Sequence, residues 1–197
     1  MIRMRVLGTV LAVVFVMAVT ALATDVTMKL SGPGAVDETT IKAGEPVSVD
    51  IYFANDKDGG RGFTTGFCLK SEDIKTVIHV EDTTGLNKTG DLKGHNGWEG
   101  TAVWNFAGIW TPSPNWDGTL PDTIGFAGAV IGKPYGKHEN KKVLSMNLIV
   151  PEPGTLVVDS CFVRPGSTWS IIHVDSEGVR SESKPTWGGP YKFKVVK

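Results

Sequence analysis

The stretch VSVDIYF at residues 47–53 decides the fold class. Its odd-numbered positions are all apolar, whereas its even-numbered positions hold Ser, Asp and Tyr. Alternation of this kind is typical of a β-strand with one buried face. The KAGEP segment at 42–46 precedes the stretch and the NDKDGG segment at 55–60 follows it, so both ends carry turn-forming residues. We therefore predict a strand that packs one face against a core.

Similar short apolar segments recur along the chain, separated by turns that use many of its 24 Gly and 11 Pro residues. The expected strands span residues 47–53, 63–69, 76–80, 101–109, 123–131, 143–150, 155–158, 168–174 and 191–196. The segments 82–97 and 110–121 are expected to be long loops. No segment combines a helical apolar stripe with helix caps, and no repeat or linker divides the chain. About nine or ten strands joined by turns predict one all-β domain, a β-sandwich or jelly roll.

The first residues have the layout of a secretory signal peptide. Arg3 and Arg5 precede an apolar run over residues 6–23, which ends in Ala-Leu-Ala, an A-x-A cleavage signal. We expect residues 1–23 to be removed and residues 24–197 to form a secreted domain, extracellular or at the cell surface, with the periplasm as the alternative compartment. An uncleaved membrane anchor is the other interpretation, because the run is long for a signal core. No other stretch is long and apolar enough to span a bilayer, so no membrane contact is expected after leader removal.

Composition excludes several classes of protein. Hydrophobic residues make up 41% of the 197 residues and charged residues 21%, which excludes a disordered or collagen-like chain. The net charge is −1, and it becomes −3 when the two arginines of the leader are removed. Such a chain has no global positive field, so nucleic acid is not an expected partner.

The mature region contains two cysteines, Cys68 and Cys161. An even pair in an oxidising compartment predicts one disulfide. The bridge would join positions 93 residues apart and, if unstrained, would stabilise the fold by ~4–5 kcal/mol. The alternative is two buried free thiols.

Six Trp residues are the most unusual feature of the chain. Trp98, Trp110 and Trp116 lie in Gly- and Pro-rich segments expected to be loops, where an exposed indole can stack on a sugar ring. Asn96 and Asp117 are neighbouring side chains that can accept hydrogen bonds from sugar hydroxyls. These five residues form the candidate ligand-binding set. The alternative is that each Trp anchors its loop to the sandwich, because Trp is highly buried on average.

Other constellations point away from catalysis and metal binding. The four His residues have no metal-ligand spacing, and the DKDG segment at 56–59 lacks the first and last ligands of a calcium loop. Motifs of nucleophilic hydrolases, zinc proteases and phosphate loops are absent from the sequence. Pairs of carboxylates such as Glu99 with Asp117 or Asp122 are expected by chance among 21 acidic residues. We therefore expect no enzyme, no metal site and no cofactor.

Two stretches carry a resemblance to known proteins. The segment KAGEPVSV at 42–49, leading to FTTGF at 63–67, resembles the opening of cohesin-like and related carbohydrate-binding-module sandwiches. The segments 158–169 and 185–191 are similar to secreted bacterial proteins of this type, many of which carry a dockerin after the sandwich. The resemblance implies a fold and assigns no catalytic residue. No dockerin follows in this sequence, so attachment through such a module is not expected.

Two functions follow as hypotheses. The first is a non-catalytic module that docks on another extracellular protein or builds a surface structure, through a sheet face or an exposed edge strand. The second is a carbohydrate-binding module that holds a polysaccharide through its loop tryptophans.

The carbohydrate hypothesis predicts a clear split among Trp variants. Trp110→Ala and Trp116→Ala are expected to abolish retention on insoluble polysaccharide and to melt near wild type, because stacking needs the indole face. Trp104, assigned to a core strand, is the control, and its replacement by Ala is expected to cost about 3–5 kcal/mol. Equal destabilisation by all three variants, measured by thermal melting, would identify the loop tryptophans as anchors.

Overall fold

A computed structural model describes most of residues 26–197. The described residues are 26–55, 57–80, 88–89, 92–94, 106–110, 117–129, 134, 137–162 and 169–197. The proposed signal peptide lies outside them, as do Asn96, Trp98, Trp104 and Trp116.

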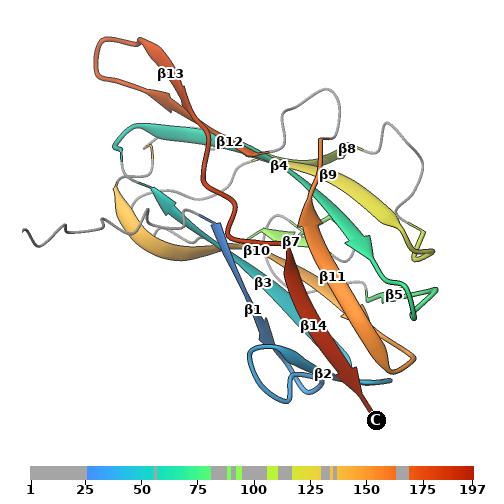
Figure 1. Cartoon of the computed structure of the whole chain (residues 1–197). Coiled ribbons are helices and arrows are strands. Elements are labelled where there is room, and N and C mark those ends of the chain that lie inside the picture. The colour runs from blue at the N-terminus through green and yellow to red at the C-terminus, as the bar shows by residue number, and fades with distance from the viewer. Residues whose placement is uncertain are drawn as a thin grey trace, which may run out of the picture.

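The described residues form fourteen β-strands, and none of them lies in a helix. The strands are β1 (Val26–Ser31), β2 (Thr40–Lys42), β3 (Pro46–Asn55), β4 (Gly60–Lys70), β5 (Ile78–His79), β6 (Lys88–Thr89), β7 (Leu92–Gly94), β8 (Phe106–Trp110), β9 (Asp122–Ala129), β10 (His138–Ile149), β11 (Gly154–Ser160), β12 (Trp169–Val174), β13 (Arg180–Ser183) and β14 (Tyr191–Val196). They build two sheets that pack face to face (Figure 1), which confirms the predicted all-β sandwich.

Sheet A has the order β1-β3-β10-β7-β6, and β5 also pairs with β10. Sheet B has the order β13-β12-β4-β11-β14-β2, with β9 on the other edge of β4 and β8 beyond β9. Pairing is antiparallel except between β14 and β2. At one end of the molecule β12 and β13 form a hairpin that projects beyond the sandwich (Figure 1).

The strand predicted at 47–53 is confirmed as β3. The four apolar residues of that stretch are at most 2% exposed, and they face the core between the sheets. On the other face of β3, its partners β1 and β10 place polar residues beside Ser48 and Asp50. The alternation in the sequence therefore predicted correctly which face of this strand is buried.

Several differences from the predicted strands have a common physical cause. The expected loop at 82–97 contains β6 and β7, and the strand expected at 76–80 shortens to β5. β2 is only three residues long, with Ile41 buried between Thr40 and Lys42, which is too short for a recognisable alternation in the sequence. β13 is a largely exposed edge strand and shows no alternating burial. Short strands form because neighbouring strands supply hydrogen-bond partners, which a sequence pattern does not reveal.

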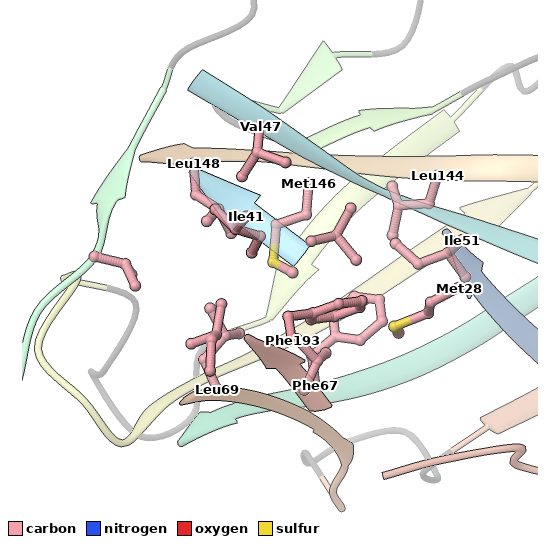
Figure 2. Packing of buried hydrophobic residues seen from close by; sticks show 14 of the residues in the cluster. Met28, Ile41, Val47, Ile51, Phe67, Leu69, Leu144, Met146, Leu148 and Phe193 are labelled. Atoms are coloured by element: carbon pink, nitrogen blue, oxygen red, sulfur yellow. The ribbon is translucent and has the colours of Figure 1, made fainter. Parts of the chain in front are cut away.

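The core contains aliphatic residues from both sheets and an aromatic cluster at one end. Figure 2 shows Met28, Ile51 and Leu144 of sheet A facing Phe67 and Phe193 of sheet B. The aromatic cluster consists of edge-to-face pairs: the ring centroids of Phe53 and Phe63 lie 5.0 Å apart, those of Phe53 and Trp169 5.5 Å, and those of Phe67 and Trp169 5.3 Å. Phe53 comes from sheet A and the other three residues from sheet B, so this cluster connects the two layers.

Two phenylalanines provide a matched test of this core. Phe67 is fully buried, so Phe67→Ala is expected to lower the free energy of unfolding by about 3–5 kcal/mol. Phe162 is 61% exposed, and Phe162→Ala is expected to change it by less than about 0.5 kcal/mol. Urea unfolding of both variants measures the difference, and similar losses would contradict the assignment of the core.

Candidate functional site

Polar and thiol side chains gather on the outer face of sheet B where β4 meets β11. Cys68 pairs with Asp159 in the antiparallel register, and the Cys161 amide donates to the Gly66 carbonyl at 3.1 Å. Residues two apart on a strand share a face. Cys68, Lys70, Asp159 and Cys161 therefore lie on one face, opposite the core face that carries Phe67, Leu69, Leu156 and Val158. We call these four residues, with Trp187, the outer cluster.

Asp159 is the centre of the outer cluster. Its Oδ2 lies 3.3 Å from Lys70 Nζ, and its Oδ1 accepts hydrogen bonds from the indole N–H of Trp187 at 3.2 Å and from the Ser160 amide at 2.8 Å. The Trp187 ring also stacks on Trp169, with centroids 5.2 Å apart. The hydrogen bond to Asp159 raises the pKa of Lys70 above its usual value, because it favours the charged form of the lysine.

The two cysteines are neighbours but are not bridged. Both are free thiols in the structure, so the predicted disulfide is not formed there. The register gives the reason, since Cys68 lies opposite Asp159 while Cys161 lies beside Gly66, one diagonal step away. Diagonal Cα atoms are about 7–8 Å apart, whereas the Cα atoms of a disulfide are about 4.4–6.8 Å apart.

The environment of Cys161 also changes its acidity. Burial and, secondly, the Cys68 sulfur raise the pKa of the Cys161 thiol to about 12.

A row of lysines extends from the outer cluster across sheet B. Lys70, Val157 and Lys192 lie in register across three strands, and Lys194 pairs with both Thr155 and Thr40. The outward positions of β2, β4 and β14 thus carry four exposed lysines, which we call the lysine face: Lys42, Lys70, Lys192 and Lys194. Lys42 forms an ion pair with Glu45 of the adjacent turn at 3.5 Å. Asp159 is the only acidic residue on the outward positions of β2, β4, β11 and β14.

The outer face of sheet A carries a different polar centre. Asp50 is 3% exposed and accepts hydrogen bonds from Ser31 at 2.8 Å, from Ser48 at 3.1 Å and from Ser145. Lys142 Nζ lies 3.4 Å from its Oδ2. Each of these contacts joins residues of the same sheet, so this centre holds β1, β3 and β10 together.

A third polar contact ties β5 to β9. His79 Nε2 lies 2.8 Å from Asp122 Oδ2, which also accepts the Gly118 amide at 2.9 Å. Asp122 is fully buried, whereas Asp117 is exposed and caps the Thr119 amide at 2.8 Å. Within the part of the chain that the structure describes, no group of three or more His, Cys, Asp or Glu side chains is arranged to hold a metal ion. Glu99, the other carboxylate considered in the sequence, lies outside that part.

The candidate glycan site is only partly covered by the structure. Asn96, Trp98 and Trp116 fall outside the described residues. Trp110, expected in a loop, is the last residue of β8 and pairs with Gly125 of β9, so that expectation was wrong. Asp117 lies among the described residues, and its carboxylate accepts a hydrogen bond from the Thr119 amide in the same turn. The sequence did not reveal the outer cluster, because its members come from three distant segments.

Comparisons with known proteins address the fold. No protein-family model and no curated protein matches the chain. Among solved structures, a type II cohesin module from the cellulosomal adaptor ScaA scaffoldin of Acetivibrio cellulolyticus has a TM-score of 0.51 at 12% identity, covering 90% of this chain and 99% of its own. The fold is that of a cohesin module.

Two further cohesin structures are similar to the chain. A type II cohesin domain from the cellulosome of Acetivibrio cellulolyticus has a TM-score of 0.50 at 13% identity, over 85% of this chain and 94% of that one. A cohesin module from a family 33 glycoside hydrolase of Clostridium perfringens has a TM-score of 0.47 at 10% identity, over 87% and 95% of the two chains. At these identities the similarity concerns the cohesin-like fold alone.

The described residues contain no helix long and apolar enough to cross a membrane.

The raised pKa of Cys161 predicts slow alkylation at neutral pH. The thiolate is the reactive form, and with a pKa of about 12 its fraction grows tenfold for each pH unit between pH 8 and 11. The rate of iodoacetamide labelling at Cys161, followed by peptide mass spectrometry, is expected to rise about tenfold per unit over that range. A rate that levels off near pH 9 would show that burial and Cys68 do not raise this pKa.

Proposed function

We propose that the chain is a secreted, non-catalytic module that docks on another extracellular protein. The cohesin-like sandwich is the observation that supports this most, because the neighbour with a TM-score of 0.51 is a module of a cellulosomal adaptor. A fold alone does not determine function, so a docking surface has to follow from the residues that this chain exposes.

The lysine face is the surface we propose for docking. It presents four exposed lysines and one carboxylate, Asp159, on a chain whose net charge is −1. Lys192 and Lys194 occupy alternate positions of β14, about 6.6 Å apart along the strand, and Lys70 lies two strands from Lys192, about 9.6 Å away. Opposite charge across an interface accelerates association and suppresses wrong partners.

The spacing indicates the kind of partner. An extended protein segment also places every second side chain on one face, about 6.6 Å apart. Acidic residues at alternate positions of such a segment would therefore match Lys192 and Lys194. A neutral polysaccharide offers no charge that complements these ammonium groups, so a protein partner is favoured.

Charge reversal on β14 tests the docking surface. The probe is a synthetic peptide of alternating Glu and Thr, and the matched peptide has Lys in place of Glu. The wild type is expected to bind the acidic peptide, and the double variant Lys192→Glu with Lys194→Glu is expected to bind it at least about tenfold more weakly, a loss of about 1.4 kcal/mol. Fluorescence anisotropy at low ionic strength measures both affinities.

The control variant carries the same charge change elsewhere. Lys57→Glu with Lys184→Glu alters two exposed lysines away from the lysine face and is expected to bind like wild type. Equal losses in both double variants would show that only overall charge matters, which contradicts a specific face. Retention on a polysaccharide panel without peptide binding would favour the carbohydrate alternative instead.

A further inference from the structure

The thiol pair of the outer cluster carries an inference separate from docking. We propose that Cys68 and Cys161 form a reversible disulfide that joins β4 to β11 in the already folded domain. The two sulfur-bearing residues share one face of adjacent strands, one diagonal step apart. Folding alone brings them together, because four residue pairs hold β4 and β11 in register without the bridge.

The residues around Cys161 leave the thiol accessible to solvent and place no side chain between it and Cys68. Its register neighbour on β4 is Gly66, which has no side chain to stand between Cys161 and Cys68. Cys68 is 7% exposed, whereas Cys161 is half-buried and can be reached from solvent. Cys161 is therefore the thiol that meets an external oxidant first, and Cys68 is the thiol that resolves the intermediate.

The reaction needs an oxidant, for which a low-molecular-weight disulfide is sufficient. The Cys161 thiolate attacks one sulfur of this disulfide, which forms a mixed disulfide and releases one thiolate. The Cys68 thiolate then attacks the Cys161 sulfur and releases the second thiolate. The released thiolates take up the two protons lost by the cysteines. The protein loses two electrons and two protons, and the small disulfide becomes two thiols.

The register also explains why the bridge is reversible. A diagonal pair starts with Cα atoms about 7–8 Å apart because the two residues are offset along the strands, so the backbone must shift locally along the strand direction before the sulfurs can bond. A bridge formed against such resistance is more easily reduced than an unstrained structural disulfide. The pair would thus be open under reducing conditions and closed under oxidising ones.

Charged groups near the sulfurs set the rate of closure. Among the described residues, Lys70 of β4 and Asp159 of β11 are the charged groups acting on Cys161, and Cys68 is its titratable neighbour. Burial, Cys68 and Asp159 keep the Cys161 thiol protonated, whereas Lys70 favours its thiolate. Closure is therefore expected to be slow at neutral pH and faster at higher pH.

The experiment uses the reduced, folded chain with oxidised glutathione, without denaturant. At intervals the protein is acid-quenched, labelled with a maleimide and weighed intact. The expected product carries no label and has lost the mass of two hydrogen atoms. Its rate of formation is expected to rise about tenfold per pH unit between pH 7.5 and 9.5. Excess reduced glutathione is then expected to restore two labelled thiols.

Variants separate this reaction from other outcomes. Cys161→Ser is expected to fold, to keep one labelled thiol and to give no lighter species. Lys70→Met is expected to slow closure by roughly threefold, whereas Lys29→Met, an exposed lysine on β1 of the other sheet, leaves the rate unchanged. Circular dichroism confirms that each variant is folded.

Three results would overturn the proposal. The first is a stable mixed disulfide on Cys161 without closure, which would place Cys68 out of reach. The second is closure only after urea is added, which would assign the bridge to the unfolded chain. The third is a bridge that excess reduced glutathione does not open, which would make it a structural disulfide. None of these results depends on the acidic peptide, so failure of docking and failure of the thiol reaction are distinguishable.

Discussion

The packing of Trp169 is the interaction on which the rest of the structure depends. Its ring meets Phe53 of sheet A and Phe67 of sheet B edge to face, and Trp187 stacks on it from the segment that leads into β14. The Trp169 side chain therefore contacts both sheets and the segment between β13 and β14 that contains Trp187. Tyr191 completes this arrangement, because its hydroxyl donates to the Val26 carbonyl at 3.1 Å and so ties β14 to the start of β1.

Three carboxylates organise the polar groups around this core. Asp50 joins the strands of sheet A, Asp122 joins β5 to β9, and Asp159 joins β4 and β11 to Trp187. Each accepts hydrogen bonds from at least two other groups, which offsets the cost of removing a charge from water. Asp159 differs from the others because it lies beside both thiols and the exposed lysines. The link from core to surface therefore runs through Trp187 and Asp159.

This link gives the proposed docking face a rigid base. β4 and β11 are central strands of sheet B, with neighbours on both edges, so their outward residues are held in fixed register. Lys192 and Lys194 lie on β14, which is fixed by β11 on one side and β2 on the other. Side chains on paired strands are positioned more precisely than side chains on loops, which suits recognition of an extended partner. The thiol pair lies at one margin of this surface, next to Lys70.

The sequence by itself determined the all-β class and the buried face of β3, because alternation with period two is a local property of the chain. It also predicted that Cys68 and Cys161 lie close together, because they are the two cysteines of the chain. Only the tertiary structure decided that they are diagonal neighbours, that Asp159 lies between Lys70 and Trp187, and that Trp110 ends a strand. These relations join residues far apart in the chain. Register between such strands is set by how whole sheets bury their apolar faces, and no local pattern contains that information.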